Sequence, residues 1–239
     1  MLEILAKTQE RFHQPPNPSI HVADRETFRY ICSGNETLGR YKMKSLKGTK
    51  TLESLMKAFA GESQARNRYT YYASIAKKEE LMQIESIFME TAENEKEHAK
   101  RFFKLIVEGM QGNLPANVTV DAEYPVAYST TMENLKAAAA GEKEEWGRLY
   151  PGFADIADSE GFPEVAAAFR NIAKVEVKHE ARYLKLLENL KNGKVFKKDS
   201  SVKWKCRNCG LVHEGAEAPK ECPACIHPQG YFEVFAETY

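Results

Sequence analysis

The stretch Ala92-Glu-Asn-Glu-Lys-Glu-His-Ala99 contains the spacing that decides the fold of this chain, Glu95-x-x-His98. Residues three apart lie on one face of a helix, so this motif aims one carboxylate and one imidazole at the same point. The chain repeats the motif as Glu176-x-x-His179, which begins 81 residues later (176 minus 95). The repetition indicates two copies of one helical ligand unit.

Each copy also has a single glutamate upstream, in Ala60-Gly61-Glu62 and in Ala140-Gly141-Glu142. The interval to the paired glutamate is 33 residues in the first copy (95 minus 62) and 34 in the second (176 minus 142). Flanking apolar positions repeat as well, as in Ala73-Ser-Ile-Ala76 against Ala154-Asp-Ile-Ala157. Solvated charge pairs explain this poorly, because duplicated surface charge has no reason to stay in register with duplicated apolar positions. Two helical hairpins that each supply one Glu and one Glu-x-x-His provide the ligands of a carboxylate-bridged di-iron centre in a four-helix bundle.

The chemistry of the donors supports this interpretation. Four carboxylates offset the charge of two divalent irons, and carboxylate with imidazole suits iron or manganese better than copper(I) or a thiophilic metal. A further motif, Glu10-x-x-His13, has no matching partner helix, and we interpret it as a chance occurrence.

Composition excludes several classes of protein. The length of 239 residues allows one or two domains with a sizeable core. The 34 basic residues balance 34 acidic ones, which argues against a nucleic-acid face or a polybasic membrane patch. No apolar run approaches the length of a membrane span. The N-terminus lacks the hydrophobic stretch of a signal peptide, and Glu3, Glu10 and Asp24 argue against a transit peptide. We therefore expect a cytoplasmic protein.

We expect three parts: an N-terminal extension over 1–46, an all-α ferritin-like four-helix bundle with the di-iron site over 47–195, and a small metal domain over 200–239. In the extension, Gln14-Pro-Pro-Asn-Pro18 breaks regular structure. Cys32 is isolated and receives no role. Met43 is a candidate natural start, so we expect residues 1–42 to be dispensable for the chemistry.

Periodic apolar positions and end signals predict the four helices of the bundle. Thr51 is the expected N-cap of the first helix, Thr130-x-x-Glu133 is a capping-box pattern, and Pro151 is a candidate kink. The connection from Met110 to Ser129 is too long for a tight turn and suits the crossover of a ferritin-like bundle. The helices are expected from about Thr51 to Glu80, from about Leu81 to Glu108, after Thr130 to Glu160, and from Pro163 to about Asn192.

The C-terminal part carries a second metal motif. Four of the five cysteines form two knuckles, Cys206-x-x-Cys209 and Cys222-x-x-Cys225, with twelve residues between them (210 to 221). Such a pair makes a tetrahedral tetrathiolate site, which a module this small needs as a staple. The ligand types leave a structural zinc ribbon and a one-iron redox centre both open. Fusion to a di-iron site favours the iron centre, because an oxidised di-iron site must be re-reduced.

Three stretches resemble the rubrerythrin family: Phe59–Tyr69, Ala92–Ala99 and Trp204–Gly210. The resemblance covers about residues 47–239. The N-terminal extension has no counterpart in the usual family pattern, and Cys225 is followed by Ile226 where simple rubredoxins have glycine. The resemblance implies a rubredoxin-like C-terminal domain and an oxidoreductase, a peroxidase that reduces hydrogen peroxide to water in oxidative-stress defence. The electrons would come from NAD(P)H through separate reductases and rubredoxin-type donors. A homodimer or larger assembly is also implied; whether electrons cross between its subunits stays open.

The resemblance further implies one carboxylate beyond the repeat, Glu145, and a swap between His98 and Glu145 as redox-linked ligands of one iron. Glu95 and Glu176 would bridge the irons. Tyr69 and Tyr150 would donate to ligand carboxylates; the alternative is that both are ordinary core aromatics. The implied catalytic and di-iron residues are Glu62, Glu95, Glu142, Glu145, Glu176, His98 and His179, with Cys206, Cys209, Cys222 and Cys225 on a third iron, where zinc is possible in preparations.

Two other functions stay open from the sequence. The first is a ferroxidase or iron-handling protein, since ferritin-like bundles share that chemistry. The second is a zinc-stapled metal-binding interaction protein without turnover. Visible absorption separates the second from the main hypothesis, because a ferric tetrathiolate is red and zinc is colourless.

Overall fold

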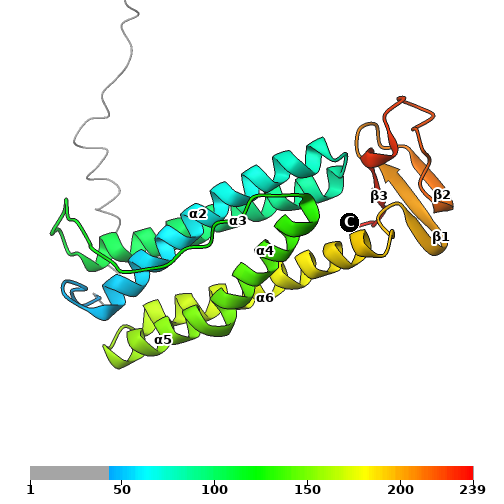
Figure 1. The fold of residues 1–239 in the computed structure, drawn as a ribbon. Helices are drawn as coiled ribbons and strands as arrows, with labels where there is room; N and C mark the ends of the chain where they lie inside the picture. The colour runs from blue at the N-terminus through cyan, green and yellow to red at the C-terminus, as the bar shows by residue number, and fades with distance from the viewer. Residues whose placement is uncertain (1–42, 239) are drawn as a thin grey trace, which may run out of the picture. The chain divides into compact units, whose positions relative to one another are not determined.

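The computed structural model describes residues 43–238. The predictions for Glu10, His13 and Cys32 therefore fall outside the described residues. Most of the described chain is helical (Figure 1). The helices are α2 (Lys50–Lys78), α3 (Met82–Gly109), α4 (Thr131–Glu144), the π-helix η1 (Glu145–Leu149), α5 (Tyr150–Ser159) and α6 (Pro163–Lys191).

These helices form two antiparallel hairpins. In the first, α2 packs along α3; in the second, the continuous run α4–η1–α5 packs along α6. The connection after Gly109 has no regular structure and returns along the bundle, so that α3 and α4 run in the same direction (Figure 1). The predicted crossover connection is thereby confirmed.

The hydrophobic core is divided into two clusters by a layer of buried charge. Along α2, Leu55 and Ala58 belong to one cluster and Ala65 and Tyr69 to the other, with the fully buried Glu62 between them. The other long helices follow the same order: α3 places its buried glutamate between Phe88 and Phe102, and α6 between Phe169 and Tyr183. In each of these helices the buried glutamate thus lies between apolar residues of the two clusters, and together these glutamates form one charged layer across the bundle.

The predicted N-cap of the first helix was wrong. The N-cap of α2 is Thr49, whose hydroxyl accepts a hydrogen bond from the Leu52 amide at 3.1 Å, and not Thr51. The Thr51 hydroxyl instead donates to the Glu160 carboxylate at 2.6 Å, and its amide donates to the same group. The predicted cap at Thr130 is confirmed, since its hydroxyl accepts from the Glu133 amide.

An equivalent contact joins the two hairpins at the start of α4. The Glu79 carboxylate accepts from the Thr131 amide at 3.2 Å, just as Glu160 caps the start of α2. Glu79 and Glu160 are related by the repeat (160 minus 79 is 81). Each hairpin therefore supplies an anionic carboxylate to the helix N-terminus of the other, where the backbone dipole favours negative charge.

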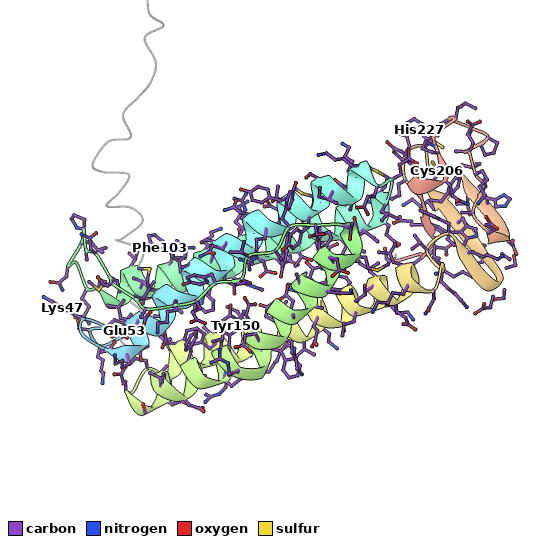
Figure 2. The ribbon with its side chains drawn as sticks, in the orientation of Figure 1. Lys47, Glu53, Phe103, Tyr150, Cys206 and His227 are labelled. Atoms are coloured by element: carbon purple, nitrogen blue, oxygen red, sulfur yellow. The ribbon has the colours of Figure 1, made fainter. Side chains whose placement is uncertain are left out.

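The C-terminal residues form a small antiparallel sheet of β1 (Lys197–Cys206), β2 (Val212–Glu217) and β3 (Phe232–Val234), in the order β2-β1-β3, with a 3₁₀ turn η2 (Gln229–Tyr231). Its core is Trp204 and Phe232 together with Ala218 and two cysteines. Cys206 ends β1 in this module, whereas Tyr150 begins α5 of the bundle (Figure 2). No helix between residues 43 and 238 is long and apolar enough to span a bilayer.

Residues before α2 belong to the bundle core. Met43 and Leu46 are buried in the first cluster, and the Leu46 amide donates to the Gly109 carbonyl at 2.9 Å. Leu46 lies so close to the end of α3 that a Cβ on Gly109 would be 2.2 Å from its Cδ1 and 2.4 Å from its Cγ. Glycine is therefore required at position 109 for close approach rather than for an unusual backbone angle.

This contact yields a stability prediction. We expect Gly109→Ala to lower the free energy of unfolding by about 1–3 kcal/mol, because overpacking displaces Leu46. Gly152→Ala is the matched control: it also lies in a helix, nothing is within 4 Å of its added Cβ, and it should gain up to about 1 kcal/mol. Chemical denaturation of both variants measures the difference. Equal effects at the two positions would contradict the proposed role of Leu46.

Candidate metal centres

The buried layer of the bundle holds the repeated glutamates and histidines. Glu62 comes from α2, Glu142 from α4, and the two Glu-x-x-His motifs from α3 and α6. The four repeated glutamates are at most 1% exposed and His179 is 4% exposed. Four carboxylates in a dry core are unfavourable unless cations compensate them. The layer is therefore a candidate for metal binding on burial alone.

The donor atoms converge in two groups. Glu62, Glu95, His98 and Glu176 each offer an atom within 4.8 Å of the others, and so do Glu95, Glu142, Glu176 and His179. Only Glu95 and Glu176 belong to both groups, so they occupy the position of bridges between two ions.

The orientation of the shared carboxylates supports bridging. Glu95 places Oε2 3.0 Å from His98 Nδ1 and Oε1 3.1 Å from His179 Nδ1. Glu176 places Oε1 2.9 Å from His98 Nδ1 and Oε2 2.7 Å from His179 Nδ1. Each carboxylate thus directs one oxygen to each half of the site, as a ligand shared by two ions must do.

The layer also contains polar atoms without hydrogen-bond partners. Among the described residues these include one oxygen each of Glu62, Glu95 and Glu142, both oxygens of Glu176, and His179 Nδ1. Buried polar atoms normally have a partner, so a cluster of unpaired ones needs an explanation. Two cations, each coordinated by carboxylate oxygens and an imidazole nitrogen, would satisfy these atoms. The residues present fit a di-metal centre.

The pKa values in the layer show the same charge imbalance. Burial, followed by repulsion from Glu95, raises the pKa of Glu142 to about 8, and burial also raises the pKa of Glu62 well above its usual range. Burial opposes ionisation of Glu95, but contacts with His179 and His98 outweigh it and lower its pKa to about 2. Burial likewise opposes protonation of His179, but Glu142, Glu176 and Glu95 raise its pKa to about 12. Without metal, protons therefore take the place of cations.

Two tyrosines hold the single glutamates across the hairpins. The Tyr69 hydroxyl on α2 donates to Glu142 Oε1 at 2.5 Å, and the Tyr150 hydroxyl on α5 donates to Glu62 Oε1. Burial, followed by the neighbouring carboxylates, raises the pKa of both phenols well above their usual value, so both remain donors. These contacts give both hydroxyls a defined partner among the candidate ligands, which is the arrangement that the family resemblance implied.

Among the predicted ligands of the di-iron site, Glu145 is the one that belongs to neither group of converging donors. It begins the π-helix η1, at the place where the second copy of the repeat has one residue more than the first. The offset between copies is 80 at the single glutamates (142 minus 62) and 81 at the tyrosines (150 minus 69). A π-turn absorbs one extra residue without ending the helix, which keeps Tyr150 in register.

Glu145 shares the electrostatic environment of the buried layer. Burial raises its pKa well above the usual range, followed by the charges of Glu62 and Glu142. Glu62 belongs to the group that contains His98 and Glu142 to the group that contains His179, so carboxylates from both halves of the site act on Glu145.

Residues outside the predicted set also support the layer. Arg182 on α6 donates to the Thr91 hydroxyl and to Glu90 on α3, each at 2.7 Å, and so joins the two motif helices. Tyr183 packs its ring edge-on against Tyr69 at 5.5 Å between centroids. The repeat of Arg101-Phe-Phe against Arg182-Tyr-Leu was visible in the sequence, but it gave no sign of these contacts.

The four cysteines of the C-terminal module converge as predicted. Cys206 Sγ and Cys225 Sγ are 3.8 Å apart, and Cys209 Sγ and Cys222 Sγ are 3.6 Å apart. Disulfide sulfurs would be about 2.05 Å apart. Four sulfurs at about 2.3 Å from one ion have tetrahedral edges of about 3.8 Å. The geometry fits a tetrathiolate site and excludes disulfides.

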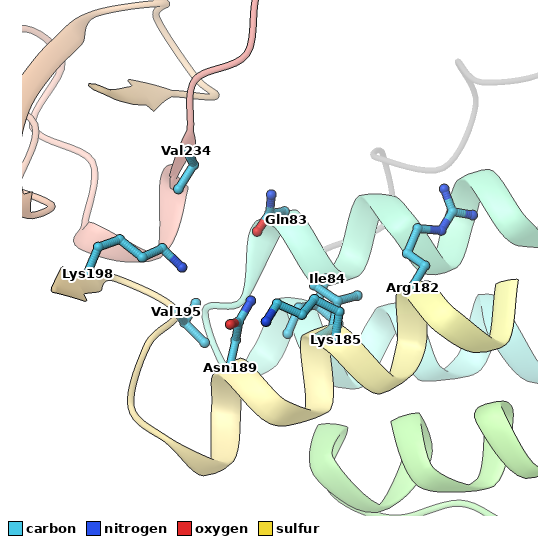
Figure 3. A pocket seen from close by; sticks show the side chains of 9 residues that line it. Gln83, Ile84, Arg182, Lys185, Asn189, Val195, Lys198 and Val234 are labelled. Atoms are coloured by element: carbon cyan, nitrogen blue, oxygen red, sulfur yellow. The ribbon is translucent and has the colours of Figure 1, made fainter. Parts of the chain in front are cut away.

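A separate cavity lies among α3, α6 and the strands (Figure 3). Its volume is about 330 Å³, and none of the candidate metal ligands lines it. Its lining includes Gln83, Ile84, Lys185 and Lys198. The cavity therefore gives no direct access to either candidate centre.

A four-helix bundle with bridging glutamates, joined to a four-cysteine strand module, defines a carboxylate di-metal protein with a fused tetrathiolate domain. A family model described as Rubrerythrin matches residues 53–187, and one described as Rubrerythrin, rubredoxin-like domain, matches residues 204–233. The chain belongs to the rubrerythrin family. The expected ferritin-like fold is confirmed, as are the cofactors: a di-iron carboxylate site and a four-cysteine iron site.

Individual relatives agree with this assignment. A rubrerythrin of Clostridium perfringens is 64% identical over 198 residues, which is 82% of this chain and 100% of the relative. A rubrerythrin of Nitratidesulfovibrio vulgaris is 49% identical over 80% of this chain and 97% of its own length. A structure described as the partially reduced state of nigerythrin is similar with a TM-score of 0.52 and 29% identity, covering 85% of this chain and 98% of that one.

The pKa values predict how the metal-free protein responds to pH. Glu142 binds a proton in the folded state that the unfolded chain loses above pH 4.5, so stability falls as pH rises from 4.5 to about 8. The contribution of His179 has the same sign, because it is complete below pH 6.5 and is lost as pH rises towards about 12. We expect the metal-free protein to lose roughly 1–3 kcal/mol between pH 5 and 8.

Thermal unfolding of chelator-treated protein at several pH values measures this loss. Metal should stabilise the protein more at pH 8 than at pH 5, because cations replace the protons. Glu142→Gln, which cannot ionise, should flatten the profile of the metal-free protein. A metal-free protein that becomes more stable from pH 5 to 8 would contradict the assignment of charges.

Proposed function

We propose that this protein is a non-haem di-iron peroxidase that reduces hydrogen peroxide to two waters with two electrons and two protons. The observation that carries the proposal is the pair of shared carboxylates, Glu95 and Glu176, each directing one oxygen to each half of the site. Membership of the rubrerythrin family supports it. When bound, the two irons supply both electrons for cleavage of the O–O bond.

The chain's own residues hold and orient this chemistry. In the proposed ligand set, Glu62, Glu95, His98, Glu142, Glu176 and His179 bind the two irons, and Glu145 is the extra carboxylate. Tyr69 and Tyr150 fix the terminal carboxylates Glu142 and Glu62 through their hydroxyls. The two hydrophobic clusters on either side of the layer keep bulk water out.

The C-terminal module is proposed as the point of electron entry. Cys206, Cys209, Cys222 and Cys225 would bind one iron that passes electrons singly to the bundle. Its external donors would be rubredoxin-type proteins, reduced by NAD(P)H-dependent reductases. A homodimer or larger assembly and a cytoplasmic location stay predictions.

Removal of the module tests this electron path. Protein lacking residues 200–239 should retain single-turnover oxidation by peroxide but lose multiple turnover with a rubredoxin-type donor system by at least about 100-fold. The matched control is the full-length chain with iron in the bundle and zinc in the module, which preserves the fold but carries no electrons. Stopped-flow and steady-state assays separate the two activities. Full steady-state activity in either form would overturn the proposed path.

Glu145 is proposed to replace His98 on one iron when the centre is oxidised. Ferric iron is the harder ion and favours an anionic oxygen, whereas ferrous iron accepts neutral imidazole. Membership of the rubrerythrin family supports this swap, and Glu145 lies three residues after Glu142 on the same helical run.

We expect Glu145→Ala to bind two irons, because the repeated ligands remain, but to react with peroxide roughly 100-fold more slowly. Metal analysis and stopped-flow absorption measure the two properties. Structures of the oxidised and reduced wild-type protein give the independent test. Identical iron ligands in both states would show that the swap does not occur.

Ferroxidase activity is the principal alternative. Ferritin-like bundles share this type of site, so the distinguishing measurement compares peroxide with dioxygen as the oxidant of added ferrous iron. A protein that oxidises excess ferrous iron with dioxygen but does not react with peroxide would be an iron-handling protein. A colourless, zinc-filled module in protein isolated from iron-replete cells would instead favour a structural role.

A further inference from the structure

The second half of the bundle differs from the first at two positions that contact each other. Trp146 lies in the π-helix η1, within the segment that holds the extra residue of the second copy. Glu180 directly follows His179, where the first copy has Ala99 after His98 (180 minus 99 is 81). The Trp146 indole Nε1–H donates to Glu180 Oε2 at 2.7 Å. Two departures from the repeat therefore form one interaction between η1 and α6.

The indole is held from a second side. The ammonium of Lys143, three residues earlier in the chain, lies 3.6 Å from the centroid of the Trp146 ring. A cation at this distance is attracted to the face of an indole. Lys143 thus contacts the face of the indole, and Glu180 accepts a hydrogen bond from its edge.

The hydrophobic core holds the π-turn at its C-terminal end. Leu149 is partly buried against the first hydrophobic cluster, whereas Glu145 and Trp146 are half-buried and belong to neither cluster. Among the described residues, the hydrogen bond and ion pair of Arg148 are with Glu144 of the same helical run. Within the described part of the chain, the Trp146–Glu180 bond is the one side-chain hydrogen bond from η1 to another helix. This bond is therefore the side-chain hydrogen bond that ties the N-terminal part of the π-turn to α6.

We propose that the Trp146–Glu180 hydrogen bond positions Glu145 by anchoring the π-turn to α6. Trp146 directly follows Glu145, so rotation of the π-turn moves both side chains together. Glu180 directly follows the candidate ligand His179. The hydrogen bond therefore connects the π-turn to the part of α6 that carries the site. Trp146 and Glu180 are positioning residues that act through Glu145. This inference rests on the proposed role of Glu145 in the peroxide reaction.

Hydrogen exchange on the metal-free protein tests the anchor without any assay of activity. We expect Trp146→Phe and Glu180→Ala to exchange the amides of residues 145–149 about tenfold faster. Glu180→Gln keeps an oxygen acceptor and should behave as wild type. Glu144→Ala is the matched control, because it removes the contact with Arg148 in the same segment but no contact with α6. Unchanged exchange in both Trp146→Phe and Glu180→Ala would overturn the anchor.

A double-mutant cycle then separates positioning from general stability. Glu180→Ala should slow single-turnover oxidation by peroxide about tenfold in the wild-type background and have no further effect in the Glu145→Ala background. Additive losses would show that Glu180 does not act through Glu145, and would overturn the proposal. Trp146→Phe repeats the cycle if Glu180→Ala does not fold.

The absorption spectrum of the diferric centre gives a measurement that does not require turnover. Trp146→Phe should shift this spectrum towards that of Glu145→Ala, while Glu180→Gln should leave it unchanged. A wild-type spectrum in Trp146→Phe would overturn the proposal. If wild-type protein does not react with peroxide at all, the peroxidase function fails, but exchange and spectra still decide whether the anchor exists.

Discussion

The burial of negative charge in the middle of the core is the constraint on which the rest of this structure depends. Four glutamates that are almost fully buried face only two imidazoles. Such a layer is unfavourable unless protons or cations neutralise it. The hydrophobic clusters on both sides supply the stability that permits the layer, and they exclude the water that would otherwise screen it. One arrangement thus creates both the affinity for metal and the dry environment for its chemistry.

The two halves of the chain stabilise each other by exchanging equivalent contacts. Tyr69 donates to a glutamate of the second hairpin, and Tyr150 donates to Glu62 of the first. At the helix starts, Glu79 and Glu160 cap each other's hairpins in the same reciprocal way. Because each of these four contacts crosses between hairpins, neither hairpin alone can pair these four carboxylates. The site therefore assembles only when the whole bundle does.

The sequence predicted the parts of the structure that depend on spacing. Motifs at i and i+3 fixed which residues converge, and the knuckle spacing fixed the tetrathiolate, because local geometry alone determines both. The N-cap was wrong because Thr49 and Thr51 are the same residue type, and the choice depends on the distant Glu160. The one-residue difference between copies was visible, but the sequence could not show that a π-turn absorbs it, since that depends on packing against α6.

The same extra residue explains how a duplicated unit becomes an asymmetric site. An even repeat would give each ion equivalent ligands, and neither half would respond differently to a change in iron charge. The insertion leaves the shared carboxylates and both tyrosines in register, yet it coincides with the π-turn that begins at the additional carboxylate Glu145. The residues of the π-turn are less buried than the four repeated glutamates, so a change in the conformation of this turn disturbs less of the core. In the proposed ligand swap, the adaptation to redox state therefore lies in the one segment that departs from the repeat.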